Sequence, residues 1–159
     1  MNGDAGQMYK SNFLDGAVRV PLLVKRPGAV CGAVCAAPVE WIDIGPTLVE
    51  AAGGEIDYPQ FGRSLHPLLN NPQNEHRAEA ISEHAGEIML LDREWKAALN
   101  ARGEIYLLFD VQSDPNEAEN LAGRAGYGAL EGDLRRRLLE RLVSTQLQGV
   151  GYRFDLHGR

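Results

Sequence analysis

The chain has 159 residues, of which 44% are hydrophobic and 24% are charged, and its formal net charge is −6. This composition is typical of a folded globular protein and excludes a disordered one. The acidic balance argues against a nucleic-acid partner, which would require a basic face, and no apolar run approaches the roughly 20 residues that span a bilayer.

The first zone, residues 1–56, is expected to be a piece of a larger α/β domain. It opens without the basic and apolar stretches of a signal peptide, which favours a cytoplasmic location. Val18–Val24 is apolar apart from Arg19 and Pro21, which predicts a strand covered on both faces, as in a parallel sheet flanked by helices. Such a strand needs neighbours that this zone does not supply. We therefore expect either a fragment of a large mixed sheet or a sheet completed by a second copy of the chain.

A helix is predicted after Trp41. Asp43 is suited to be its N-cap, and Pro46 suits the first turn, where an amide proton would have no partner. Gly53 is suited to the position just past the helix end. The residues between leave little polar face, so the helix is expected to be largely buried.

The remainder divides into a connector, residues 57–78, and a small α+β subdomain, residues 79–159. The connector is dense in turn residues and has three leucines, at 65, 68 and 69, that would pin it to a surface. Four short strands are predicted in the subdomain, at 80–82, 88–91, 95–99 and 105–109. The hairpin-sized gaps between them predict a four-stranded antiparallel meander. A final helix, with an apolar stripe at Leu130, Leu134, Leu138 and Leu142, should pack against one face of that sheet.

The sequence contains no recognisable motif that would carry out catalysis by itself. There is no nucleophile elbow and no phosphate-binding glycine loop, and the four histidines are scattered. Cys31 and Cys35 have no second Cys or His pair nearby, so they are interpreted as ordinary loop residues instead of a zinc or redox pair. From the residues alone we predict no catalytic residue and no metal ligand.

Several short sequence motifs nevertheless occur in a recognisable order along the chain. They comprise Lys10 to Val24 with Arg19-Val20-Pro21, Arg26-Pro27-Gly28, Ile42 to Leu48, Phe61 to Leu69, Ser82-Glu83-His84, Trp95-Lys96 and Leu108 to Ala122 with Asp114-Pro115. Together these motifs resemble the C-terminal third of members of the sulfatase family, within the alkaline-phosphatase superfamily. The resemblance covers roughly residues 3–123.

The resemblance implies a parent enzyme that hydrolyses the sulfate ester of a small molecule. Sulfatases use a formylglycine and a divalent metal, usually calcium, and the resemblance places both in residues outside this chain. The isolated chain is therefore expected to be inactive. Two alternatives remain open: a phosphonate monoester hydrolase or phosphodiesterase of the same superfamily, and a structural module that self-associates through residues 18–24.

Two residues are candidates for contact with the sulfate group. Lys10, nine residues before Arg19, falls on the position of a sulfate-binding lysine of the family, where its ammonium would face a sulfate oxygen. The other reading is a solvated loop lysine. Asp15 stands where the family more often has Glu. His84 is a candidate for the active-site rim, or else an ordinary solvated histidine.

Overall fold

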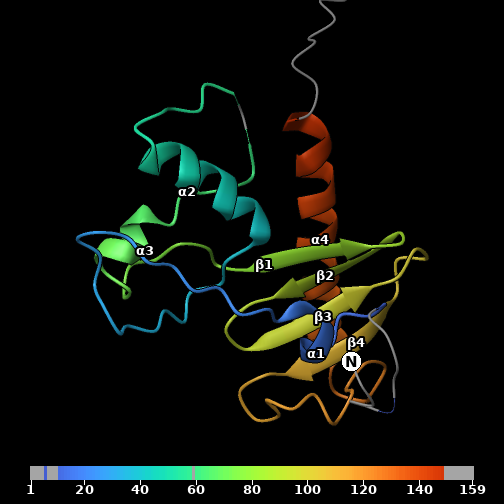
Figure 1. Cartoon of the computed structure of the whole chain (residues 1–159). Helices are drawn as coiled ribbons and strands as arrows, with labels where there is room; N and C mark the ends of the chain where they lie inside the picture. Colours follow the sequence, from blue (N-terminus) through green and yellow to red (C-terminus); the bar gives the residue numbers. More distant parts are fainter. Residues whose placement is uncertain (1–5, 7–10, 59, 149–159) are drawn as a thin grey trace, which may run out of the picture.

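We analysed a computed structural model of the chain, which describes residue 6 and residues 11–58 and 60–148 (Figure 1). A four-stranded sheet with a long C-terminal helix occupies one side of the molecule. Short helices and loops from the first 78 residues lie beside the β1 edge of the sheet and beneath one of its faces. Within the described part, no helix is both long and apolar enough to cross a membrane.

The sheet consists of β1 (Ala80–His84), β2 (Glu87–Leu91), β3 (Trp95–Leu99) and β4 (Ile105–Asp110). The strands lie in chain order and every neighbouring pair is antiparallel. The predicted meander is confirmed, because each connection is short enough to return the chain directly to the adjacent position.

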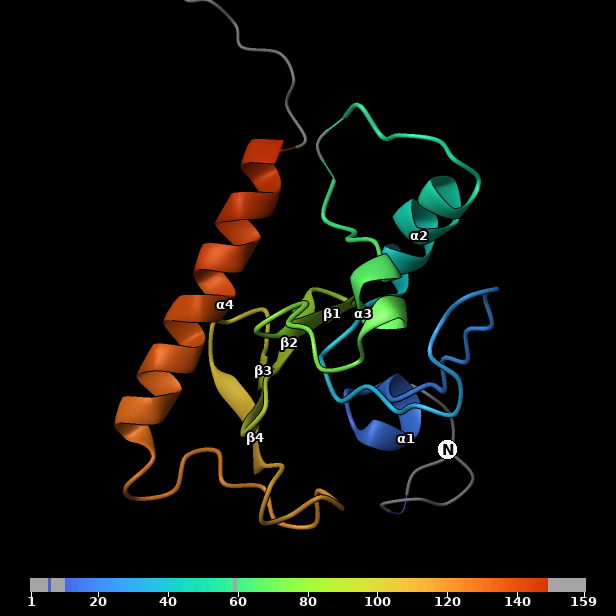
Figure 2. The same cartoon turned by 90° about the vertical axis from the view of Figure 1, so that its left-hand side faces the viewer.

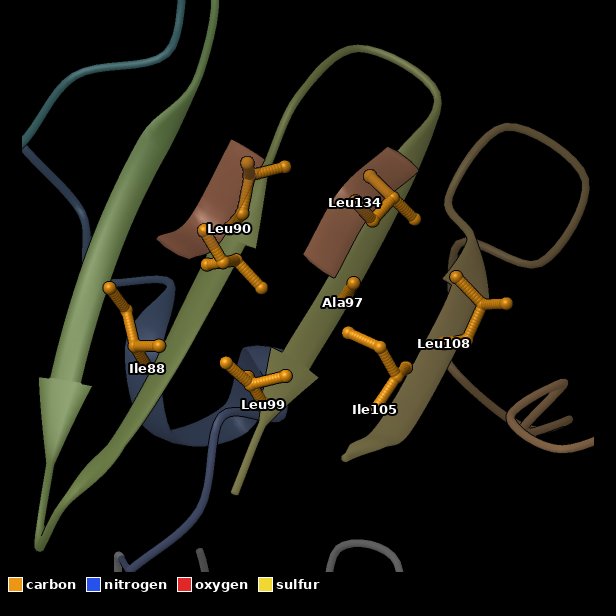
Figure 3. Packing of buried hydrophobic residues seen from close by; sticks show 8 residues of the cluster. Ile88, Leu90, Ala97, Leu99, Ile105, Leu108 and Leu134 are labelled. Carbon is orange, nitrogen blue, oxygen red and sulfur yellow. The ribbon is translucent and has the colours of Figure 1, made fainter. Parts of the chain in front are cut away.

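Helix α4 (Gly128–Gln148) covers one face of the sheet (Figure 2). Leu134 and Leu138 are fully buried there. Figure 3 shows the sheet residues that form this core with them: Ile88, Leu90, Ala97, Leu99, Ile105 and Leu108. The predicted amphipathic helix and its packing face are therefore confirmed.

The opposite face of the sheet is covered by the start of the described chain. Helix α1 (Asp15–Val18) lies there, on the other side of the sheet from α4 (Figure 2). Phe13, Met89 and Ala98 form a second, smaller buried cluster at this contact. The α/β to α+β class expected from the sequence is thus confirmed as a mixed fold with both sheet faces covered.

The helix predicted near Trp41 is present as a short 3₁₀ turn, η2 (Trp41–Asp43), continued by α2 (Ile44–Ala51). Pro46 lies in the first turn of α2, and Gly53 follows its end with φ +77°, a conformation that glycine adopts without steric cost. The Asp43 side chain does not cap α2, contrary to the prediction. It caps the preceding 3₁₀ turn instead, by accepting from the amide of Glu40 at 2.9 Å.

The connector contains α3 (His66–Asn70) and is pinned as expected, since Leu65 and Leu68 are buried. A buried hydroxyl ties the connector to α2. The Leu65 amide donates to Thr47 Oγ1 at 2.9 Å, and that hydroxyl donates to the Asp43 carbonyl at 2.5 Å.

Two expectations for the first zone are wrong. Residues 18–24 do not form a strand: Val18 ends α1, and the chain then runs as an exposed coil that pairs with neither edge strand of the described sheet. Helix α2 is not largely buried either. Pro46 and Thr47 are its buried residues, whereas Leu48 is 64% exposed.

Candidate functional site

The two residues singled out from the sequence have different positions. Lys10 lies outside the described residues, and the chain is followed continuously from Ser11 to Tyr58. His84 ends β1, pairs in register with Glu87 and is exposed at the β1–β2 hairpin. The described residues nearest to this candidate are residues 11–19, which directly follow Lys10 in the chain. Residues 11–19 are called the anchor segment.

An aromatic side chain fixes the anchor segment to the sheet. Phe13 is 1% exposed and packs with Met89 of β2 and Ala98 of β3. Burial of a phenylalanine of this kind is worth about 1.5–3 kcal/mol. The backbone next to it is also held, because the Leu14 amide donates to Asn12 Oδ1 at 3.0 Å.

A buried group of charges lies beside Phe13. Lys96 of β3 is fully buried, and its ammonium donates to carboxylates of both Asp15 and Glu117. The second oxygen of Glu117 accepts the Asp15 backbone amide at 2.7 Å. We call Lys96, Asp15 and Glu117 the Lys96 triad. It joins the anchor segment to β3 and to the loop after β4.

The strand alternation explains why a lysine is buried here. Trp95, Ala97 and Leu99 pack on the α4 side of the sheet, and successive residues of a strand face opposite sides. Lys96 therefore faces α1, as Ala98 does. An unpaired ammonium would be strongly disfavoured in that position, and the two carboxylates make its burial tolerable.

The two carboxylates of the triad differ in acidity. Burial disfavours the ionised form of Asp15, but the hydrogen bonds from Lys96 and Arg19 together with the Lys96 charge outweigh it, so the pKa of Asp15 is lowered. Burial dominates at Glu117 and raises the pKa of that carboxyl despite its bond from Lys96. Asp15 therefore holds the negative charge more firmly, while Glu117 acts as the buried bridging acceptor.

The loop that supplies Glu117 is well ordered by local hydrogen bonds. Asp110 Oδ1 accepts the amides of Gln112 and Ser113, at 3.0 and 3.1 Å, and Asp114 Oδ2 accepts the Glu119 amide at 2.8 Å. These are Asx-type turns, and residues 111–120 form turns without a helix. Glu117 has φ +55°, a left-handed conformation that is uncommon for glutamate.

A second buried charge cluster lies between η2 and the connector. Asp43 is fully buried and accepts hydrogen bonds from the side chain of Arg77, from the Arg63 amide at 2.7 Å and from the Glu40 amide. His76 Nε2 is 3.1 Å from the same carboxylate. Burial opposes the Asp43 charge, but these donors, led by Arg77, lower the pKa of Asp43 to about 2.

Close backbone contact accompanies this Asp43 cluster. A Cβ at Gly62 would lie 2.2 Å from the carbonyl oxygen of Ile42, so only glycine fits at that position. The Arg77 guanidinium also donates to the Phe61 carbonyl at 2.8 Å. The Phe61-Gly62-Arg63 stretch thus has a structural role, which is to bring the connector against η2.

Sequence reasoning did not single out the residues of either cluster as a set. One signal was available for Lys96, which is the lone charge of an otherwise apolar predicted strand, between Trp95 and Ala97-Ala98-Leu99. No comparable signal marked Glu117 or Arg77, whose partners lie 102 and 34 residues away in the chain.

The described residues do not include a set of ligands for the metal that the resemblance implies. Among residues 11–58 and 60–148, no group of three or more His, Cys, Asp or Glu side chains is arranged to hold a metal ion. Cys31 and Cys35 are both free and exposed. No catalytic step is therefore derived through a metal bound to this part of the chain.

Sequence comparison relates nearly the whole chain to one family. Residues 3–144 match the family described as N-sulphoglucosamine sulphohydrolase, C-terminal. Similar proteins include arylsulfatase K of Xenopus laevis, 33% identical over 82% of this chain, and choline-sulfatase of Rhizobium meliloti (strain 1021), 33% identical over 77%. The chain spans only about a quarter of the length of these relatives, 27% and 25%.

The fold is also similar to a solved structure. A phosphonate monoester hydrolase from Silicibacter pomeroyi superposes with a TM-score of 0.72 and 25% sequence identity. The match covers 85% of this chain and 31% of that one. Most of the fold of this chain is therefore shared with part of a much longer hydrolase.

Proposed function

Since the chain belongs to the family of N-sulphoglucosamine sulphohydrolase C-terminal regions, we propose that it serves as the C-terminal part of an enzyme that hydrolyses a sulfate ester. The sulfatase names of the relatives support this activity, and their greater length supports a catalytic portion supplied by other residues. The substrate class proposed is a small molecule that bears a sulfate ester.

The role proposed for this segment is to form one wall of the active site and to present Lys10 to the sulfate group. Lys10 is separated from the buried Phe13 by two residues. A lysine ammonium at the sulfate group would supply positive charge where negative charge develops during ester hydrolysis.

The observation that carries this role is the anchorage of residues 11–19 by Phe13 and by the Lys96 triad. The aromatic contact and the paired charges hold the residues that follow Lys10 against the sheet. Formylglycine and a divalent metal, the groups the resemblance implies, would supply the nucleophile and Lewis acid from residues outside the described part.

Exposed apolar side chains support contact with a further catalytic portion. Leu22, Leu23 and Val24 are 43%, 89% and 45% exposed in the coil after α1. Trp41 is 72% exposed at the start of η2. In this proposal the catalytic portion covers them, so that residues 18–24 acquire in the complete enzyme the neighbours that they lack here.

The test is the hydrolysis of p-nitrophenyl sulfate by the complete enzyme and by this chain alone, both with added calcium. We expect turnover by the complete enzyme and none by the isolated chain. Lys10→Ala should lower kcat/KM of the complete enzyme by about 10²–10³-fold, as the loss of one preorganised donor does. Turnover by the isolated chain, or full activity of the K10A variant, would overturn the proposal.

A second activity is favoured by the structural match, since the superposed hydrolase acts on phosphonate monoesters. A complete enzyme that cleaves a phenyl phosphonate monoester at least tenfold more efficiently than p-nitrophenyl sulfate would establish this alternative. The reverse preference would establish the sulfatase. The Lys10 role applies to both, because the two ester groups present anionic oxygens.

A further inference from the structure

We infer that the chain binds a small oxyanion of the sulfate or phosphate type in a pocket between the connector and α4. The guanidinium groups of Arg63 and Arg141 hold this ligand, and the site is called the arginine pocket. The residues that line it are distinct from those of the Lys96 triad. The site is independent of the proposed function, because its ligand and its test involve only this chain.

The arginine pocket lies where the two regions of the fold meet. It is lined by the residue before η2, by residues of the connector, by the start of the α+β subdomain and by α4. Its volume is about 260 Å³, several times the roughly 30 Å³ that one water molecule occupies, so a tetrahedral oxyanion fits. The charged residues of its lining are Glu40, Arg63, Arg77, Glu79 and Arg141.

Both carboxylates of the lining already have donors. Glu79 Oε2 accepts from the Arg137 guanidinium at 2.5 and 3.2 Å. One oxygen of Glu40 accepts a backbone amide of β1 at 3.0 Å, and the other lies 3.7 Å from Arg77. The Arg77 guanidinium donates through two of its nitrogens to Asp43. The acidic groups around the pocket are therefore occupied by two of the nearby arginines.

The other two arginines have no acidic partner among the residues that the structure describes. Arg141 Cζ lies 4.9 Å from the centre of the Phe61 ring, and the Arg141 side chain is only partly exposed. Arg63 Nη1 donates to the backbone carbonyl of His76 at 2.8 Å. A charge that is partly removed from water without a counter-ion costs free energy, and an anion in the pocket would offset this cost.

The arginine pocket also concentrates positive charge. Arg63, Arg77 and Arg141 line the same small volume, whereas Asp43 and Glu40 both pair with Arg77. Positive charges that share a pocket repel each other, and an anion that binds between them relieves this repulsion. Because the two guanidinium groups without acidic partners carry one charge each, a doubly charged ligand is favoured.

The chemistry of the guanidinium group determines the class of ligand. It is planar and presents five N–H donors in a fork that matches two oxygens of an oxyanion. Arg63 uses Nη1 for a carbonyl, and Arg141 places its guanidinium over Phe61, so N–H donors of both remain for a ligand. The ring also restricts Arg141 before the ligand arrives, which lowers the entropic cost of binding.

The first experiment is a titration of the 159-residue chain with sodium sulfate, followed by the NMR shifts of backbone amides. Sodium chloride holds the ionic strength constant. The amides of Glu40, Arg63 and Ile81, which belong to the lining, should shift together and saturate with a dissociation constant on the order of 1 mM. The absence of saturable shifts at these amides up to about 50 mM sulfate would overturn the site.

Substitutions test whether the named arginines hold the anion. Arg141→Gln should weaken sulfate binding about tenfold or more, because it removes charge-assisted hydrogen bonds to the anion. Arg63→Gln should have the same effect, and it supplies an independent measurement if the first variant is unstable.

The matched control is Arg135→Gln, which removes the same charge from an exposed position of α4 outside the pocket. Its affinity for sulfate should change by less than about twofold, because exposed charges are screened. Equal weakening in R135Q and R141Q would reduce the binding to non-specific attraction and rule out the site.

Two further probes identify the source of the bound group. Methyl sulfate that binds as tightly as inorganic sulfate would support a sulfate ester group of a larger molecule as the ligand. Binding of inorganic sulfate alone would support the free ion. Acetate that binds more tightly than either would contradict the proposal, because it would assign the pocket to a carboxylate.

Discussion

Residues 80–148 and residues 11–78 differ in how completely they bury their large apolar side chains. The sheet and α4 close a core in which Leu90, Leu108, Leu134 and Leu138 have no exposed surface. The earlier region instead leaves large apolar side chains in solvent, with Leu23 at 89% and Trp41 at 72% exposure. It is held by a few buried apolar side chains together with buried charges at Asp43 and at Lys96. Hairpin strands find their partners close by in the chain, whereas the contacts of the earlier region depend on residues far apart in the sequence.

The largest effect is expected from removing the central charge of the earlier region. Asp43→Ala removes the carboxylate that is hydrogen-bonded to the buried Arg77 and leaves only Glu40, at 3.7 Å, as an acidic partner, which should cost about 3 kcal/mol of local stability. Limited proteolysis should then cut residues 40–78 early while β1–β4 stay intact. Simultaneous loss of the sheet would show that the two regions unfold as one unit.

An effect of similar size is expected in the core under α4. Leu138→Ala should lower the unfolding free energy by about 3 kcal/mol, because the side chain is fully buried and leaves a cavity. Urea denaturation followed by circular dichroism measures it. The neighbouring Leu139→Ala serves as control, since Leu139 is 44% exposed and should change stability by less than about 0.5 kcal/mol.

Lowering the pH should also affect the two regions differently, because it should destabilise the region around Asp43. The pKa of Asp43 is about 2 in the folded chain, against an ordinary 3.8, so the cluster's contribution is complete above about pH 5 and is lost as the pH falls towards 2. The loss amounts to about 2 kcal/mol. The protection factor of the Arg63 amide, which is the exchange rate corrected for the intrinsic pH dependence of exchange, reports this loss when it is measured from pH 5 down to pH 2. The variant Asp43→Asn should show a flat profile over this range; an equally steep profile would assign the effect to other carboxyls.

The smallest effect concerns the exposed coil. Leu23→Ser should change the unfolding free energy of this chain by less than about 0.5 kcal/mol, because the side chain is already 89% exposed. The same substitution also tests the prediction that the chain self-associates through residues 18–24. Light scattering after size exclusion should show a dimer in the wild type and a monomer in L23S if that coil joins two copies, and a monomer in both otherwise.

The sequence was informative where structure is local. The four strands, their order and the α4 stripe follow from periodicity and from short gaps between apolar runs, and all are present. Residues 18–24 were predicted wrongly because their composition is that of a covered strand, while strand formation depends on pairing and packing partners that composition does not report, and here these residues pair with no strand of the described sheet. The Lys96 triad was beyond sequence reasoning for a related reason. Asp15 and Glu117 meet only when the fold brings together positions 102 residues apart.

That separation has a consequence for the order of folding. Each strand pair of the sheet joins neighbours in the chain, so the meander closes only short loops. The contact between Asp15 and Glu117 closes a loop of about a hundred residues and requires β3 and the loop after β4 to be in place. During synthesis the anchor segment leaves the ribosome long before Glu117 does, so it must wait for its partners. Docking of α1 is therefore expected to be a late event, after the sheet and α4 have formed.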